Sequence, residues 1–226
     1  MKNTLKLVTL LLAGLFTTDI IAQTTFGLKA GTGFSTAKVE TQDEDYSDDL
    51  ILKPTFMGGF TLDFAINEAL SIESGLQFAN RGVMYREYWN NWEYREITNL
   101  FYVDLPILFK AAYVTGNTKL YIAGGPYVGA GVLGKVNYKN IDSGDVDESD
   151  NLTIKWGNDY NKHDLHRLDY GIDFRLGAEI GKVQLGLYNQ FGLADISTSD
   201  YDGHKSNNRS FGVSIAILMS GEGGTE

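Results

Sequence analysis

The sequence predicts an all-β protein, an eight-stranded antiparallel up-and-down transmembrane β-barrel. Three observations carry this prediction: eight segments with alternating apolar residues, connections that are short at one end and long at the other, and an N-terminal secretion signal. In the clearest segment, residues 168–180, apolar side chains alternate with Asp, Gly, Arg and Glu. Successive side chains of a strand point to opposite faces, so this segment has one apolar and one charged face.

The N-terminal residues 1–22 are expected to be a signal peptide. Lys2 and Lys6 precede the apolar run 7–16, and cleavage is expected after Ala22. A membrane anchor is the alternative for this segment, but polar residues interrupt its apolar run after residue 16.

The rest of the chain is expected to form one barrel domain at residues 23–219, followed by a short polar tail at 220–226. A tilted strand needs about nine to eleven residues to cross a bilayer. The expected strands are 24–34, 55–66, 69–81, 97–112, 119–133, 167–180, 183–193 and 209–219. Their apolar stripes carry no charge. A charge facing lipid at mid-bilayer costs about 2–4 kcal/mol, so the stripes suit lipid contact.

Two tight turns predict the register between strands. Asn90-Asn91 can adopt the positive φ angles of a two-residue hairpin turn, and Gly181-Lys182 suits a second one. The pairs that follow are Trp89 with Trp92, Leu76 with Leu105, Ile72 with Phe109, Ile180 with Val183 and Glu179 with Gln184. A slip of one residue would mix the apolar and polar faces.

The connections alternate in length along the chain. The short ones are 67–69, 113–118 and 181–182, and the long ones are 35–54, 82–96, 134–166 and 194–208. Outer-membrane barrels have short periplasmic turns and long extracellular loops, with both termini in the periplasm. The expected location is therefore the cell outer membrane.

A soluble periplasmic lipocalin-like ligand binder is the alternative barrel, with apolar side chains inside and polar ones outside. Alternation alone does not separate the two. The polar faces are rich in glycine, which suits a crowded interior: Gly27, Gly31, Gly33, Gly171, Gly177, Gly186 and Gly192. Together with the long loops at one end, this favours the membrane barrel.

Two segments carry a resemblance to a known family. Residues 102–110, Tyr-Val-Asp-Leu-Pro-Ile-Leu-Phe-Lys, and residues 124–127, Gly-Gly-Pro-Tyr, resemble the PorT-like small outer-membrane barrels of Gram-negative bacteria, which are OmpA-like and eight-stranded. The resemblance covers essentially the whole mature chain. Most members have no assigned function, and the name-giving member is similar to an accessory of a protein-secretion and gliding apparatus. No residue motif carries that role to this chain.

Ten charged residues lie on the polar faces of the predicted strands. They are Lys29, Asp63, Glu73, Arg81, Asp104, Lys110, Asp169, Asp173, Arg175 and Glu179. The interior of an eight-stranded barrel is just wide enough for side chains to fill it. We therefore expect these charges to pair and plug the lumen. The alternative is a narrow small-solute channel, biased toward cations by six acids against four bases.

The second long loop is rich in aromatic residues: Tyr85, Tyr88, Trp89, Trp92 and Tyr94. They form either an interaction platform for sugar or protein, or an aromatic belt and cross-strand pairs that stiffen a hairpin. Two other loops have acidic runs, at 43–49 and 142–150, which suit either solvent exposure or weak calcium binding.

Composition limits the partners. The formal net charge is −10, which argues against nucleic acid, and the absence of cysteine excludes disulfides and a lipid-attachment cysteine. Expected partners are outer-membrane lipid and lipopolysaccharide, with a surface or envelope protein possible through the loops. The barrel is expected to be a monomer.

No catalytic or metal site is predicted, and no cofactor is expected. His163, His166 and His204 lie in predicted loops, and Ser197, Ser199 and Asp200 share a loop with His204. A barrel hydrolase would need a nucleophile, a base and an orienting group within hydrogen-bond reach. His163 and His166 could chelate a metal, but no third ligand is identifiable. The predicted function is a non-catalytic barrel with a structural or surface-interaction role.

Overall fold

A computed structural model describes residues 24–41, 47, 50–90, 92–142, 145–147, 151–199 and 203–220. The predicted signal peptide, residues 1–22, and residues 221–226 of the predicted tail lie outside this part of the chain. Among the described residues, no helix is long and apolar enough to cross a membrane.

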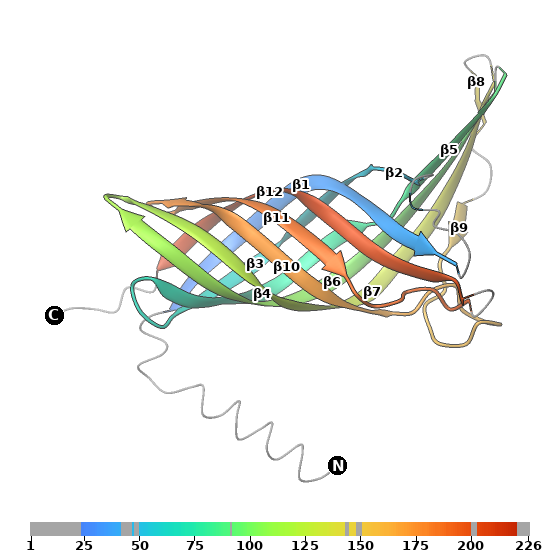
Figure 1. Cartoon of the computed structure of the whole chain (residues 1–226). Coiled ribbons are helices and arrows are strands. Elements are labelled where there is room, and N and C mark those ends of the chain that lie inside the picture. The colour runs from blue at the N-terminus through green and yellow to red at the C-terminus, as the bar shows by residue number, and fades with distance from the viewer. Residues whose placement is uncertain are drawn as a thin grey trace, which may run out of the picture.

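In the described part of the chain, eight long antiparallel strands close a ring (Figure 1). They are β1 (Thr24–Glu40), β3 (Lys53–Ala65), β4 (Leu70–Arg81), β6 (Trp92–Thr115), β7 (Thr118–Asp142), β10 (Leu168–Ile180), β11 (Val183–Gly192) and β12 (Lys205–Ser220). Each pairs with its neighbour, β6 pairs with β7, and β12 pairs with β1. The ring therefore has no free edge, which confirms the predicted fold class.

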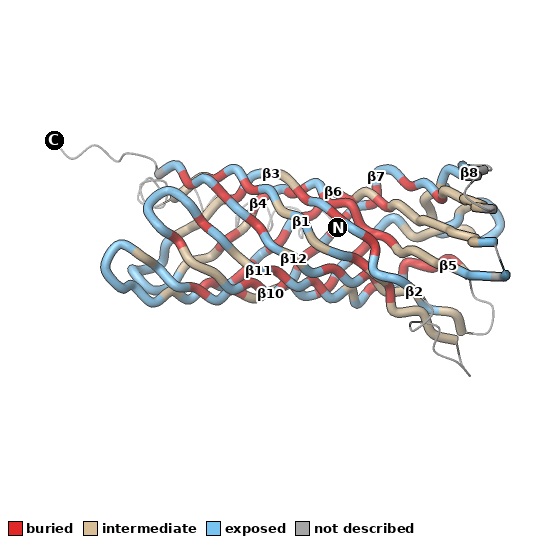
Figure 2. The backbone as a smooth tube through the Cα atoms, turned by 90° about the horizontal axis from the view of Figure 1, so that it is seen from above, coloured by how far each residue is buried: buried red, intermediate tan, exposed pale blue. Residues whose placement is uncertain are grey.

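Along each strand of the ring, exposed and buried residues alternate (Figure 2). The apolar residues point outward and the charged residues inward: Phe109 is 65% exposed, while the adjacent Lys110 is 5% exposed. This orientation excludes the lipocalin-like alternative, in which the apolar stripes would fill the interior.

The predicted register is confirmed at both turns. Asn90 has a φ of 54° and Gly181 a φ of 58°. The predicted pairs are present at Trp89 with Trp92, Ile72 with Phe109, Ile180 with Val183 and Glu179 with Gln184. The pairs on either side of Leu76, Ser74 with Ile107 and Gln77 with Asp104, have the register that places Leu76 opposite Leu105, as predicted.

The strands extend beyond their predicted limits at the long-loop end. Beyond the ring, β6 and β7 continue as a protruding sheet together with β2 (Leu50–Ile51), β5 (Met84–Trp89), β8 (Asp145–Asp147) and β9 (Asn151–Thr153). A register shift at Phe101/Tyr102 marks where the sheet leaves the ring. Bulges of this kind bend a strand and increase its twist. Figure 1 shows the protruding sheet leaning away from the barrel axis.

Candidate functional site: a charged lumen, a lid and a protruding sheet

All ten predicted charged residues face the barrel interior. Nine are buried, and Asp63 is half-buried at the short-turn end. Their positions follow from strand alternation, because each is flanked by outward-facing neighbours. They form three layers along the barrel axis, and the structure joins the layers into one chain of contacts.

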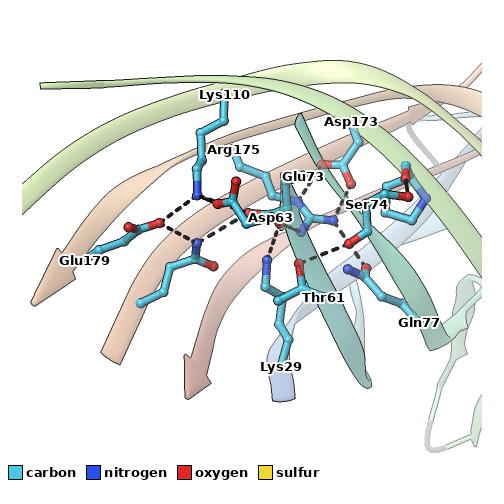
Figure 3. A network of polar contacts seen from close by, with 12 residues as sticks. Lys29, Thr61, Asp63, Glu73, Ser74, Gln77, Lys110, Asp173, Arg175 and Glu179 are labelled. Atoms are coloured by element: carbon cyan, nitrogen blue, oxygen red, sulfur yellow. Dashed lines mark hydrogen bonds and ion pairs between the residues drawn. The ribbon is translucent and has the colours of Figure 1, made fainter. Parts of the chain in front are cut away.

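The layer at the short-turn end centres on Lys110 of β6. Its ammonium group contacts the carboxylate of Asp63 and lies 2.7 Å from Oε1 of Glu179 (Figure 3). Gln184 donates to Glu179 at 3.0 Å and to Glu73 at 3.3 Å, which connects this layer to the next. One cation thus lies between two carboxylates at this end.

The middle layer centres on Arg175 of β10. Its guanidinium group donates to Asp173 at 2.7 Å, to Glu73 at 2.9 Å and to Gln77 at 3.2 Å (Figure 3). Lys29 of β1 lies 2.5 Å from the same Oε1 of Glu73. Two cations and two carboxylates therefore balance in the middle of the barrel.

The layer at the long-loop end centres on Arg81 of β4. Its guanidinium group donates to Asp104 at 2.5 Å and to Asp169 at 3.0 Å. It also lies 5.1 and 5.0 Å from the ring centres of Tyr102 and Tyr127, within range of cation–π attraction. Again one cation lies between two carboxylates.

Uncharged glutamines connect the three layers. Gln190 accepts from Arg81 at 3.0 Å and donates to Asp173 at 3.0 Å, while Gln184 connects the middle layer to the short-turn end. Sequence analysis paired Gln184 with Glu179 but gave no role in the lumen to Gln184, Gln77 or Gln190, all of which are buried. Hydrogen bonds and ion pairs therefore run without interruption from Asp169 to Asp63.

Above the Arg81 layer, two segments that sequence analysis treated as loops fold inward as a lid. The lid comprises residues 154–166 and 194–198. Its apolar residues and the underlying wall form one cluster: Leu100, Tyr102, Ile154, Trp156, Leu165, Ala194 and Ile196. The rings of Tyr102 and Trp156 lie 5.6 Å apart at 75°. Burying these apolar residues favours the inward position of the lid over an extended loop.

Two glycines of β7 make room for the lid. A Cβ atom at Gly131 would lie 2.5 Å from the Trp156 ring, and one at Gly134 would lie 2.6 Å from Ile154. Backbone contacts hold the two lid segments together, since His166 N donates to Ile196 O at 2.8 Å. Only glycine at these positions lets the lid lie directly on the strand.

The histidines connect loop segments and do not converge. His204 Nδ1 lies 3.1 Å from Ser197 Oγ, His163 Nδ1 accepts from Asp159 N at 3.2 Å, and His166 contacts Asn158. Asp200 lies outside the described residues, as do most of the two acidic runs. Within the described ranges, no group of three or more His, Cys, Asp or Glu side chains could hold a metal ion.

The protruding sheet has two chemically different faces. Residues directly opposite each other on neighbouring strands share a face. The inner face, on the side of the lumen, carries Tyr85, Glu87, Trp92, Tyr94, Glu96 and Tyr138. The outer face, on the side of the lipid-facing surface, carries Met84, Arg86, Tyr88, Arg95, Ile97, Lys135 and Lys139.

This division separates the predicted aromatic residues. Tyr85 and Tyr94 lie together on the inner face with ring centres 6.4 Å apart, and Tyr138, which sequence analysis missed, stacks on Tyr94. Tyr88 points to the outer face and is 66% exposed. Tyr88 lies three residues after Tyr85 on the same strand, and side chains an odd number of residues apart point to opposite faces. The Trp89 side chain lies outside the described residues.

A carboxylate lies among the inner-face tyrosines. Glu96 is directly opposite Tyr85 on one side and Tyr138 on the other. Burial raises the pKa of the Glu96 carboxyl, because it disfavours the charged form. Burial and the nearby Glu96 also raise the pKa values of Tyr94 and Tyr138. The inner face is thus a partly buried aromatic and acidic surface.

Comparison with known protein families identifies the chain. The family model described as outer membrane protein beta-barrel domain matches residues 21–198. The chain belongs to this family. It is therefore an integral protein of the cell outer membrane, and the apolar outer surface of its barrel faces lipid. By the rule for such barrels, the short turns are periplasmic and the lid and protruding sheet are extracellular.

Solved structures similar to this chain are also outer-membrane proteins. Neisserial surface protein A is 13% identical, with 85% of this chain and 96% of that chain covered and a TM-score of 0.34. Ail of Yersinia pestis, in complex with the heparin analogue sucrose octasulfate, is 10% identical, with coverage of 86% and 99% and a TM-score of 0.34. OprG of Pseudomonas aeruginosa is 10% identical, with coverage of 87% and 96% and a TM-score of 0.38. No curated protein matches the chain.

Proposed function

We propose that the protein is a closed, non-catalytic outer-membrane barrel that holds an interaction surface above the membrane. The observation that carries this proposal is the uninterrupted chain of ion pairs and hydrogen bonds through the lumen. The barrel is the anchor, and the protruding sheet is the working surface.

The lumen chain supports a plug because its charges are buried and paired. Each of Arg81, Arg175 and Lys110 contacts at least two carboxylates, and Arg81 and Arg175 are almost fully buried. Removing one partner of a buried ion pair costs about 3–5 kcal/mol. Moving these side chains aside to admit solute would leave carboxylates unpaired, so the closed arrangement is favoured.

A cation-biased channel is the competing function, favoured by the two carboxylates around one cation at each end of the lumen. Planar-bilayer recordings of the refolded full chain separate the two. We expect no reproducible single-channel steps from the wild type. Steady steps of uniform size would contradict the plug, and cation selectivity would then support the channel.

The protruding sheet supports a role in surface interaction, because it lies outside the membrane and exposes aromatic and charged side chains. We propose that a single barrel performs this role, without cofactor or nucleic acid. Replacing residues 84–97 with a short Gly-Ser turn removes the hairpin but keeps the ring. Crosslinking on intact cells, compared between wild type and this variant, tests the role. Identical crosslinked partners would contradict it.

We also propose that the chain belongs to the PorT-like branch of these barrels. Support comes from residues 102–110, where Asp104 pairs with Arg81 and Pro106 is fully buried. No role in secretion or gliding is part of this proposal. Aligning sequenced relatives of the chain tests it: relatives that lack this segment but keep the fold would contradict the assignment.

A further inference from the structure

The outer face of the protruding sheet is basic, although the protein has a net charge of −10. Arg86 lies directly opposite Arg95, which lies directly opposite Lys139 on the next strand. Lys135 is on the same face of β7 and is exposed. We call these four residues the outer basic face. Like charges directly opposite each other on neighbouring strands are destabilising, so the two opposed arginines need anions.

One carboxylate serves the two arginines. Glu93 Oε1 lies 3.1 Å from Nε of Arg86 and 2.5 Å from Nη2 of Arg95. The side chains of Arg86 and Arg95 remain 28% and 27% exposed. A single carboxylate does not balance two guanidinium groups. Arg95 donates to Glu93 through Nε and Nη2, so the Nη1 end of its half-buried guanidinium group is the part that can meet an anion from outside. Guanidinium groups bind phosphate with two parallel hydrogen bonds.

A cavity lies beside this row. It has a volume of about 460 Å³, and its lining includes Met84, Ile97, Asn99, Asn137 and Lys139. The lining also includes Lys53 and Tyr138, so it combines apolar and aromatic side chains with amides and two lysines. This is the chemistry that suits a ligand with a sugar or acyl part and an anionic group.

The position of the face relative to the membrane limits what it can bind. Leu133 on β7 is 62% exposed and ends the lipid-facing stripe, and Lys135 is the next outward residue. Arg95 is six residues beyond the lipid-facing Phe101 on β6, which is about 20 Å along the strand at about 3.3 Å per residue. The sheet leans away from the barrel axis (Figure 1). The outer basic face therefore begins directly beyond the lipid-facing stripe, on the side of the barrel that carries the long loops.

We propose that the outer basic face binds phosphate groups of lipopolysaccharide. Arg95 and Lys135 contact phosphate, Arg86 extends the positive field, and the adjacent cavity accommodates sugar. This inference rests on the proposed function only in treating the protruding sheet as the working surface. It does not depend on whether the lumen conducts, so bilayer recordings and the binding experiment below can fail separately.

The test is native mass spectrometry of the folded full chain in detergent, titrated with rough lipopolysaccharide. The variant is the double substitution Arg95→Gln and Lys135→Gln. The matched control is Lys155→Gln with Lys162→Gln, which removes the same charge from exposed lid residues. We expect about 30-fold weaker binding in the variant, from about 1 kcal/mol for each basic residue near a charged surface, and no more than about a twofold change in the control.

Four further measurements separate a folding defect from a binding defect and identify the group that is bound. The variant must show the wild-type heat-dependent shift in gel mobility. Wild-type affinity must fall as salt is raised, and dephosphorylated lipopolysaccharide must bind as weakly as the variant does. Equal weakening in variant and control, or salt-independent binding, would overturn the proposal. Inorganic phosphate is added at the same concentration at which lipopolysaccharide binds. If it displaces lipopolysaccharide at that concentration, the ligand is free phosphate and not the lipid headgroup, and the proposal is overturned.

Discussion

Replacing Arg175 with methionine tests whether the lumen is a dry plug. Arg175 is 3% exposed, and its guanidinium group donates to Asp173 at 2.7 Å, to Glu73 at 2.9 Å and to Gln77 at 3.2 Å. Methionine fills a similar volume but offers no donor. Glu73 keeps Lys29 at 2.5 Å, whereas Asp173 keeps only the amide of Gln190 at 3.0 Å.

The substitution therefore leaves the buried Asp173 carboxylate without a hydrogen-bonded cation. We expect R175M to lower the free energy of unfolding by about 3–5 kcal/mol. The double variant R175M/D173N removes that carboxylate and should recover more than half of the loss, because asparagine can still accept from Gln190. The half-buried pair of Arg95 and Glu93, outside the lumen, provides a control, and R95M should cost at most about 1 kcal/mol.

Urea titration of the folded protein in detergent measures these differences. The folded fraction follows from the heat-dependent gel shift, and the dependence of free energy on urea should keep the same slope in all variants. A loss below about 1 kcal/mol for R175M would refute the reasoning. It would mean that water screens the pair and that the lumen is hydrated, as a channel requires.

Two further predictions concern the extracellular parts. Gly131→Leu should displace Trp156, since a Cβ atom at this position would lie 2.5 Å from the Trp156 ring. Trypsin should then cleave faster at Lys162, while conductance stays absent. Unchanged cleavage would contradict the lid. Burial raises the pKa of Glu96 above its usual 4.5, so the folded hairpin binds the carboxyl proton more tightly than the unfolded chain does. The hairpin is therefore most stable below pH 4.5, and its stability falls as pH rises through the raised pKa. Glu96→Gln should remove this fall in stability. Hydrogen exchange in β5 and β6, measured against pH, checks the prediction, and parallel pH profiles for wild type and variant would contradict it.

The membrane-spanning part of the fold could be predicted from sequence because lipid and lumen impose different chemistry on alternate residues. Stripes such as that of residues 168–180 allow only one register. The ends of the strands could not be predicted outside the bilayer, because residues there are not divided between lipid and lumen. The register shift at Phe101/Tyr102 also gave no signal, and it leaves Val132 and Leu133 both exposed.

The residues of the lumen could be predicted, but their partners could not. Alternation places Arg175 inside the barrel, whereas its pairing with Glu73 joins residues 102 positions apart. That contact depends on how the sheet closes, which no local pattern records. The role of the glutamines in the lumen was missed for a related reason: an uncharged side chain at an inward position draws notice only once the charges that it connects are placed.

The proposed plug implies where this protein can respond to a partner. Separating a buried ion pair to open one layer costs about 3 kcal/mol. At that free energy, the layer is open in about one molecule in 150. The three layers are connected, because Glu73 contacts Lys29, Arg175 and Gln184, and Gln190 contacts Arg81 and Asp173. A rearrangement in one layer therefore disturbs the next. The protruding sheet lies beyond this interlocked interior. The proposed anion binding on its outer face and a proton exchange at Glu96 involve none of the ion pairs of the lumen, so a signal or attachment carried by this chain is best sought there.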